Sequence, residues 1–368
     1  MTGEKYIFYG NEWSYFSMKL CAALHWGGFA FEMRRKTIEL TQWLERRSGT
    51  HRIPVLETPE KWIIDDTTPI CRLLDGRISF PSSTRRKEGL FYPSGTLGAL
   101  AAVLEEYFDE WFPRIVVLSR WSTEEENRTV AGRRLGQATA GEGADPEAVE
   151  AMSETIQGWG RKVCRALGVD TPESAQAAIA EMHRVLTICD AIVSTRPFLL
   201  GSAPTAVDCV LMGALKAHLF ADPCELKTLP PQYPNLWRWF KQNDPPLSAT
   251  STTAPPFPLL HCADSEPGMP SQIDCLLAEI NRPEAWVDVT QANCVALKEG
   301  RKAFNVRIHG VETSVLTRSY PEHSRQMLIR FIEFHLPNVE ERGRFVGSLP
   351  SRVASILEKK SATERARL

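Results

Sequence analysis

The stretch THRIPVLETPEKWIIDDTTPICRLL, from Thr50 to Leu74, contains two short strand-like runs followed by the start of a helix. Residues 52–56 form an apolar run with Pro54 inside it, and a proline normally confines a strand to a sheet edge. Alternatively, Pro54 begins the strand in the cis form, which is common only at X-Pro bonds. Residues 62–64 then predict a second short strand after a turn.

The residues around this stretch predict an α/β domain. The segment 65–69, DDTTP, has the acidic and hydroxyl residues and the early proline of a helix N-terminus. Upstream, residues 6–9 predict a strand, residues 18–24 a helix and residues 29–37 another strand. The resulting order is strand, helix, strand, connecting segment, strand, strand, helix. This is the thioredoxin-like arrangement, which we expect over residues 1–80.

Two serines, Ser14 and Ser17, stand at the start of the first predicted helix, where thioredoxins carry their two reactive cysteines. Unpaired backbone N–H groups and the helix dipole favour negative charge there. A free thiol has a pKa of about 8.5, and the thiolate is the nucleophile. A hydroxyl that donates a hydrogen bond at this position would stabilise a thiolate. The alternative is that both serines are only helix caps.

A second motif lies at Arg196–Asp208, RPFLLGSAPTAVD. Thr205 and Asp208 form the acidic version of a capping box at the start of an apolar helix over residues 209–220. The string resembles the P-F-L-x-G-x-x-P-[ST]-x-x-D signature of the helical domain of glutathione transferases. Residues 230–240 resemble the YPNLxxW entry to a later helix of that domain, so the resemblance covers about residues 5–242.

The resemblance implies a thioredoxin-like N-terminal domain at 1–80, an all-α C-terminal helical bundle at 95–243, and glutathione as co-substrate. The resemblance is to the serine-type enzymes of this family, in which a serine stabilises the glutathione thiolate. Ser14 is therefore the first candidate for that role and Ser17 the second. Tyr9 is the third, because other classes use a tyrosine at the end of the first strand.

The resemblance also implies which residues hold glutathione. Ile53, Pro54 and Val55 would bind its cysteinyl backbone, with Val55 pairing in the manner of a strand. Asp66 and Thr67 would bind the amine and carboxylate of its γ-glutamyl end. The usual pair in the family is Glu or Gln followed by Ser, so this sequence has a shorter acid and an added methyl group.

Residues 96–121 predict an amphipathic helix that carries the aromatic residues Tyr107, Trp111 and Trp121. These aromatic residues are candidates for a hydrophobic substrate pocket, and the alternative is that they pack in the core of a bundle. Residues 122–150 are polar and rich in Gly, Ala and Glu, and we expect a loop there. Helices are predicted at 148–167 and 173–194.

After residue 242 the family resemblance ends. Residues 244–270 are rich in Pro, Ser and Thr and predict a linker, followed by a C-terminal extension at 271–368. In the extension the sequence predicts helices at 270–282, 324–336 and 351–368 and a hairpin at 304–313. The extension could cover the active site, enlarge the bundle or form a dimer contact. His309, His323 and His335 are too widely spaced to predict a metal site, and we expect no metal.

The composition excludes several classes of function. The formal net charge of −2 gives no reason to expect nucleic acid or an anionic membrane as a partner. No apolar run reaches the roughly 20 residues needed to span a bilayer. Nine cysteines are scattered without a CxxC pair, which favours reduced thiols and a cytoplasmic location.

The sequence thus predicts a glutathione transferase, in which the glutathione thiolate attacks a hydrophobic electrophile. The family resemblance further implies a homodimer and a role in detoxification. A non-catalytic scaffold that binds a protein partner is the alternative, although such a scaffold has no reason to keep Ser14, Asp66 and Thr67 together. A glutathione-dependent thiol reductase is disfavoured, because neither Ser14 nor Ser17 can form a mixed disulfide.

Overall fold

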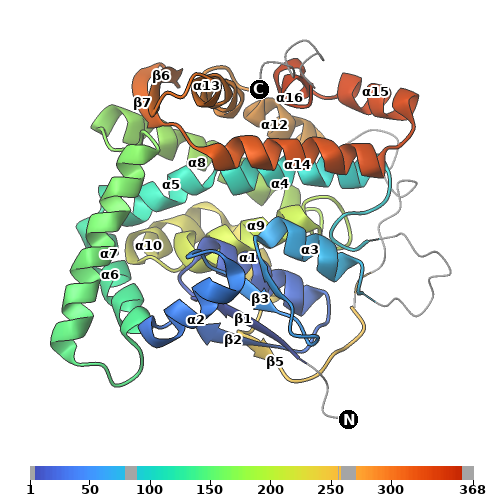
Figure 1. The fold of residues 1–368 in the computed structure, drawn as a ribbon. Helices are drawn as coiled ribbons and strands as arrows, with labels where there is room; N and C mark the ends of the chain where they lie inside the picture. The colour runs from blue at the N-terminus through green and yellow to red at the C-terminus, as the bar shows by residue number, and fades with distance from the viewer. Residues whose placement is uncertain (1–4, 79–88, 256, 258–270, 359–368) are drawn as a thin grey trace.

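The structure is a computed structural model that describes residues 5–78, 89–255, 257 and 271–358. Its N-terminal part has the thioredoxin-like order predicted from the sequence, with α1 and α3 near one face of the sheet and α2 near the other (Figure 1). The elements are β1 (Tyr6–Gly10), α1 (Tyr15–Trp26), β2 (Phe31–Arg35), α2 (Ile38–Ser48), β3 (Val55–Glu57), β4 (Ile63–Asp65) and α3 (Thr67–Asp75).

The sheet has five strands in the order β4-β3-β1-β2-β5. Strand β1 runs parallel to β2 and antiparallel to β3. The fifth strand, β5 (Ser248–Ala249), lies in the segment predicted to be a linker and pairs antiparallel with β2 at the sheet edge. The Ile53–Pro54 bond is cis, so the second of the two interpretations of Pro54 is the one observed.

A helical bundle follows, as predicted. Its helices are α4 (Thr96–Glu110), α5 (Pro113–Leu118), α6 (Glu125–Ala140), α7 (Pro146–Ala166), α8 (Pro172–Val193), α9 (Ala206–Ala214), α10 (Pro223–Gln232) and α11 (Pro234–Asn243). Two π-helical turns, Ser119–Thr123 and Leu215–Leu219, continue α5 and α9.

The prediction of a loop at 122–150 is wrong, because α6 occupies most of that segment. Its glycines lie at a contact between helices. A Cβ atom on Gly132 would come within 2.7 Å of the Gln157 side chain, and one on Gly136 within 2.9 Å of the Val149 carbonyl oxygen. Glycine therefore lets α6 approach α7 closely here, whereas in the sequence it indicates a loop.

The acidic half of the capping box is built as predicted. The carboxylate of Asp208 accepts hydrogen bonds from the backbone N–H and hydroxyl of Thr205, both at 2.8 Å, and from the Leu199 N–H at 2.8 Å. The helix that it starts, α9, packs against α1. A Cβ atom on Gly213 would lie 2.5 Å from the Tyr15 carbonyl oxygen, so this glycine permits the close contact between the two domains.

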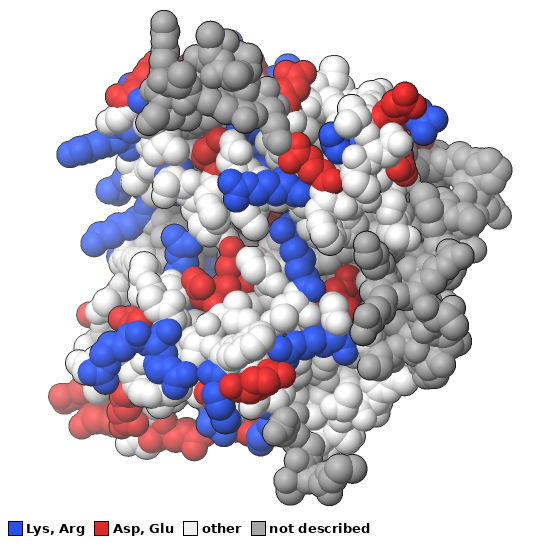
Figure 2. All heavy atoms as spheres, turned by 45° about the vertical axis from the view of Figure 1, so that its right-hand side comes forward, with Lys and Arg blue, Asp and Glu red and all other residues white. Residues whose placement is uncertain are grey.

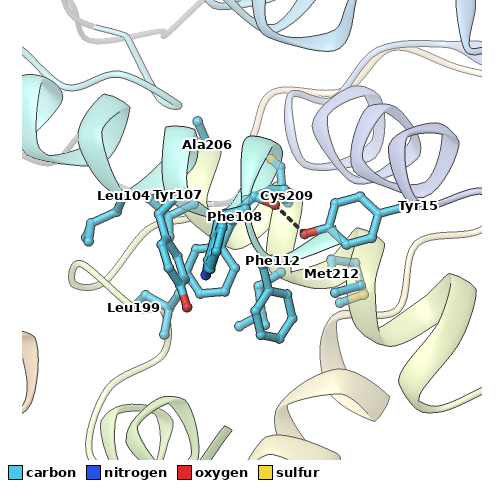
Figure 3. Close-up of a cluster of buried hydrophobic side chains, with 14 of the residues drawn as sticks. Tyr15, Leu104, Tyr107, Phe108, Phe112, Leu199, Ala206, Cys209 and Met212 are labelled. Atoms are coloured by element: carbon cyan, nitrogen blue, oxygen red, sulfur yellow. Dashed lines mark hydrogen bonds between the residues drawn. The ribbon is translucent and has the colours of Figure 1, made fainter. Parts of the chain in front are cut away.

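One continuous hydrophobic core joins the sheet, the bundle and the extension. Figure 3 shows the part of it where Tyr15 of α1 reaches α4, and its hydroxyl donates to the Phe108 carbonyl oxygen at 2.8 Å. Phe112 and Met212 lie beside this contact (Figure 3). The packing therefore fixes α1, whose N-terminus carries Ser14, against the bundle.

The C-terminal extension folds onto the bundle. It consists of α12 (Ser271–Ile280), α13 (Trp286–Lys298), β6 (Ala303–Ile308), β7 (Val311–Leu316), α14 (Ser319–His335), α15 (Val339–Ser348) and α16 (Ser351–Ile356). The hairpin and the first two of the three predicted helices are confirmed. The third begins at Ser351 as predicted but ends at Ile356, and the predicted part at 359–368 lies outside the described residues. Helix α14 lies along α4 and above α3 (Figure 1).

Three side-chain contacts hold α14 against the rest of the protein. Ser324 donates a hydrogen bond of 2.7 Å to Glu106 on α4. Phe331 packs against Tyr92 with ring centroids 4.8 Å apart, and the guanidinium of Arg72 on α3 lies 4.0 Å from the Phe331 ring centroid. The extension is therefore an integral part of the packed structure.

No helix within the described residues has the length and apolarity that crossing a bilayer requires.

Candidate functional site

A cavity of about 1120 Å³ lies where the N-terminal domain, the bundle and the start of α14 meet. Four of the residues predicted to bind glutathione line it: Ile53, Pro54, Asp66 and Thr67. Charged side chains of both signs also line it. Acidic and basic residues likewise meet in the middle of the molecular face drawn in Figure 2.

Asp66 has an unusual backbone conformation at this cavity. Its φ of 69° lies in the left-handed region, which is uncommon for residues other than glycine. It is the N-cap of α3, and its Oδ1 accepts a hydrogen bond of 3.3 Å from the Thr68 N–H. Strained conformations of this kind cluster at functional sites. Thr67, the first residue of α3, is almost fully buried beside it.

The C-terminal extension reaches Asp66 through Tyr320, in the first turn of α14. The Tyr320 hydroxyl donates to Asp66 Oδ2 at 2.7 Å. Burial and the negative charge of Asp66 raise the pKa of Tyr320, so the hydroxyl stays protonated and remains a donor. The ring of Tyr320 also contacts Arg52, whose guanidinium carbon lies 4.8 Å from the ring centroid.

The backbone of Val55 is already used within the sheet. Val55 pairs with Tyr9 of β1 on one side and with Asp65 of β4 on the other, and its side chain is fully buried. Ile53 lies just before β3 and lines the cavity. A peptide backbone that lies at this end of β3 would therefore meet Ile53 rather than Val55.

Ser14 is half-buried at the N-cap of α1, and its Oγ accepts a hydrogen bond of 3.4 Å from the Ser17 N–H. The loop before it is fixed by the buried Arg120, which donates to the Trp13 carbonyl oxygen at 2.7 Å. Ser17 is fully buried, and its Oγ accepts from the Asn11 N–H at 3.2 Å. Of the two serines, only Ser14 is partly exposed, and neither is among the described residues that line the large cavity.

Tyr9 faces the opposite side of the sheet from α1. It packs with Trp43 of α2 at a centroid distance of 5.6 Å, and its hydroxyl donates to Glu57 at 3.1 Å. Strand alternation accounts for this, because the neighbouring Phe8 points into the main core instead. Burial, followed by the charge of Glu57, raises the pKa of Tyr9.

The aromatic residues predicted to line a substrate pocket, Tyr107, Trp111 and Trp121, are at least 96% buried, and none is among the described residues that line the large cavity. Tyr107 and Trp111 donate hydrogen bonds to the buried carboxylate of Glu181 at 2.8 and 2.6 Å. Trp121 packs against α7, where a Cβ atom on Gly160 would come within 2.4 Å of its ring.

Other apolar residues form the walls of the cavity. They include Phe16 on α1, Trp159 on α7 and Met327 on α14. Trp159 is 58% exposed, so its indole ring is available to a ligand. The sequence showed Trp159 within a predicted helix, but only its unusual exposure distinguishes it from core tryptophans, and exposure cannot be read from sequence.

Beneath the cavity lies a buried charged network. Lys19 of α1 is fully buried and forms ion pairs with Asp109 and, at 2.7 Å, with Glu105 of α4. Thr68 of α3 donates to Asp109 at 2.9 Å. Burial raises the pKa of Asp109 to about 6, although Lys19 opposes the shift. The network therefore ties the helix that carries Ser14 to both α3 and the bundle.

Two further carboxyl groups on α4, Glu106 and Glu110, line the same cavity. Burial raises the pKa of Glu106 well above its usual range and raises that of Glu110 to about 8. Glu110 is therefore mostly neutral at pH 7, and burial disfavours the charged form of Glu106 as well, which limits the negative charge of the cavity.

The described residues contain no cluster of three or more His, Cys, Asp or Glu side chains that could hold a metal ion. The three histidines considered earlier are far apart. His309 contacts Glu181 with 2.9 Å between Nε2 and Oε2, His323 lines the cavity, and His335 packs on Phe331.

Two family models match the chain, one for each predicted domain. The model of the N-terminal domain of glutathione S-transferases matches residues 13–77, and that of the C-terminal domain matches residues 172–242. Residues 13–77 and 172–242 are therefore domains of the glutathione S-transferase family. The family assignment made from the sequence is thus confirmed. No curated protein sequence matches the chain.

Three solved structures illustrate the similarity. A beta-etherase from Sphingobium sp. strain SYK-6 is 16% identical, with a TM-score of 0.45, and the match covers 67% of this chain and 97% of that one. A glutathione S-transferase from Rhodospirillum rubrum is 16% identical, with a TM-score of 0.42 and coverages of 69% and 96%. A theta class enzyme with bound glutathione from Xanthomonas axonopodis pv. citri is 16% identical, with a TM-score of 0.38 and coverages of 64% and 91%.

Proposed function

We propose that this protein is a serine-type glutathione transferase, in which the glutathione thiolate attacks a hydrophobic electrophile. The observation that supports it best is the placement of Asp66. An acidic residue in a left-handed conformation faces a large cavity from the N-terminus of α3, with Thr67 beside it and Ile53 on the same wall. This arrangement suits an amino acid end group that carries both an ammonium and a carboxylate.

In this proposal the γ-glutamyl ammonium donates to the Asp66 carboxylate, which keeps lone pairs free beside its bonds from Thr68 and Tyr320. The γ-glutamyl carboxylate lies against Thr67 and the positive end of the helix dipole of α3. The cysteinyl backbone pairs with Ile53, as a peptide does when it adds to a sheet edge.

Ser14 is proposed to stabilise the thiolate. The glutathione thiol loses its proton to solvent, and the Ser14 hydroxyl and the N-terminus of α1 favour the resulting anion. The thiolate then attacks carbon, so that a C–S bond forms while the bond to the leaving group breaks and its electron pair departs with that group. Phe16 and Trp159 would hold the apolar body of the electrophile.

The remaining parts of the proposal rest on the family and the composition. We propose a homodimer that detoxifies electrophiles in the cytoplasm with glutathione as its co-substrate and without a metal. The scattered cysteines, which include eight free thiols among the described residues, support a reducing compartment.

Isothermal calorimetry with glutathione tests the proposal on the wild type, on Asp66→Asn and on a control, Asp274→Asn. Asparagine keeps the N-cap and tolerates a positive φ but removes the charge. We expect micromolar to millimolar affinity in the wild type, a 10-fold or greater loss in Asp66→Asn, and no change in the control, whose side chain is exposed on α12. No binding to the wild type would overturn the proposal and favour the non-catalytic scaffold.

A further inference from the structure

Arg318, the N-cap residue of α14, is held in place by its backbone. The buried Asn293 accepts a hydrogen bond of 2.9 Å from the Arg318 N–H and donates one of 2.8 Å to the Arg318 carbonyl oxygen. The side chain makes no capping hydrogen bond, is exposed, and lines the large cavity. A fixed backbone thus presents a guanidinium to open space.

This is an unfavourable position for a cation. Ser, Thr, Asn and Asp are preferred at an N-cap because they accept hydrogen bonds, and arginine has no acceptor. The helix dipole places partial positive charge at the same end of α14. The protein atoms that surround the cavity lower the pKa of Arg318, and the like charge of Arg52 lowers it further.

The guanidinium groups of Arg52 and Arg318 have no carboxylate within 4 Å among the described residues. Glu110 is the acid that acts most strongly on Arg318, but its own pKa is raised to about 8, so at pH 7 it neutralises Arg318 only in part. A third arginine, Arg114, lines the cavity with 4% of its side chain exposed, and its Nε–H has no partner among the described residues. Arg114 is already paired with Glu181 at 2.9 Å, so an anionic ligand would mainly relieve Arg52 and Arg318.

We propose that Arg318 and Arg52 form a carboxylate-binding position where the extension meets the N-terminal domain at the cavity, which selects electrophiles with an anionic group on an apolar body. The apolar part would lie against Trp159, Phe16 and Met327, which line the same space. A planar carboxylate suits the paired donors of arginine. The inference rests on the proposed function for the placement of glutathione at Ile53, Asp66 and Thr67.

Two sources could supply the carboxylate: the electrophile, or the glycyl end of glutathione itself. The origin of Arg318 favours the electrophile. The proposed contacts to glutathione lie in the N-terminal domain at Ile53, Asp66 and Thr67, whereas Arg318 belongs to the extension. The experiment distinguishes the two sources.

Calorimetry with unreactive ligands avoids any need for turnover. The ligands are glutathione, S-benzylglutathione and S-(4-carboxybenzyl)glutathione, together with 4-methylbenzoate and its neutral amide. The proteins are the wild type, Arg318→Gln and Arg318→Lys, with Arg330→Gln as the control. Arg330 is an exposed arginine on the same helix that is not among the cavity-lining residues.

We expect the wild type and Arg330→Gln to bind the carboxybenzyl conjugate about 10-fold more tightly than the benzyl conjugate, a typical effect of one charge-assisted contact. Arg318→Gln should abolish this preference without changing the affinity for glutathione, and Arg318→Lys should keep part of it. Equal weakening of all three glutathione compounds would assign the position to the glycyl carboxylate. An unchanged preference in Arg318→Gln would overturn the inference.

If no glutathione compound binds the wild type, the proposed function fails, but the inference is still tested by the two small ligands. Binding of 4-methylbenzoate over its amide, lost in Arg318→Gln, would support a carboxylate-binding position in its own right. Equal binding of the acid and the amide, or binding of neither, would refute it.

Discussion

Tyr320 donates its hydroxyl hydrogen to Oδ2 of Asp66 at 2.7 Å, and this hydrogen bond joins residues that are 254 positions apart in the chain. Asp66 belongs to the thioredoxin-like domain, and Tyr320 to the extension beyond the family resemblance. The acidic residue of the proposed glutathione site is therefore held from both sides, by the Thr68 N–H and by Tyr320. In this protein the extension completes the site.

Replacement of Tyr320 by Phe tests this role. The ring and its contact with Arg52 stay, but the hydrogen bond to a charged acceptor is lost, which removes about 1.5–3 kcal/mol of interaction. We expect glutathione to bind about 3- to 10-fold more weakly, because the Asp66 carboxylate loses its orientation, and KM for glutathione to rise while kcat is retained. Tighter binding in Tyr320→Phe would instead show that Tyr320 competes with the ligand amine for Asp66.

Replacement of Ser14 by Gly separates its hydroxyl from its role as a cap, since glycine is nearly as good an N-cap residue. We expect the thiol of bound glutathione to return toward a pKa of about 8.5 and the activity at pH 7 to fall about 10- to 100-fold. Thiolate absorbance near 240 nm, followed as a function of pH, measures this directly.

The matched control for that experiment is Ser17→Ala. The Ser17 hydroxyl is buried against the Asn11 N–H, so its loss should cost about 1 kcal/mol of stability and leave the thiol pKa unchanged. A thiol pKa that moves in Ser17→Ala and not in Ser14→Gly would reverse the assignment of the two serines.

The parts of the fold that the sequence predicted are those specified by local chemistry. The strand that follows Pro54, the helix that begins after Asp66, and the acidic cap at Asp208 are each encoded within a few residues. Strand β5 could not be predicted, because Ser248 and Ala249 become a strand only by pairing with β2 at the edge of a sheet formed earlier in the chain. The contact from Tyr320 is equally non-local.

Several contacts in the candidate site also could not be predicted from the sequence. Lys19 lies within an apolar helix, and nothing in the sequence indicates that it is fully buried between Glu105 and Asp109. Tyr107 and Trp111 occupy an apolar stripe that suits either a core or a pocket, and nothing in that stripe predicts their hydrogen bonds to Glu181 on α8. Periodicity gives the face of a helix but not what that face contacts.

The different positions of Trp159 and Tyr107 give a direct comparison. Trp159 is exposed at the cavity, so Trp159→Ala should change stability by less than about 0.5 kcal/mol and raise KM for an aromatic electrophile several-fold. Tyr107→Phe removes a buried hydrogen bond to Glu181, so it should lower stability by about 1.5–3 kcal/mol and leave KM unchanged. Denaturant unfolding and steady-state kinetics on both variants check this, and the opposite pattern would place Tyr107 in the pocket.

Glu181 makes the stability of the folded protein depend on pH in the acid range. Burial alone would raise its pKa, but hydrogen bonds from His309 and Trp111 and the charge of Arg114 outweigh burial and lower the pKa from 4.5 to about 2. Because the folded-state pKa is below that of the unfolded chain, the stabilisation is complete above about pH 4.5 and is lost as the pH falls toward 2. A shift of this size corresponds to stabilisation on the order of 3 kcal/mol.

The variant Glu181→Gln tests this contribution, with Glu173→Gln, an exposed acid on the same helix, as its control. At pH 7 the loss of the charge leaves Arg114 without its buried partner, so stability should fall by about 3–5 kcal/mol. The difference from the wild type should then shrink as the pH is lowered from about 5 to 2, because the wild type loses the same charge by protonation. Urea unfolding at a series of pH values measures the difference. A gap that stays constant over this range would mean that Glu181 is not ionised in the folded protein.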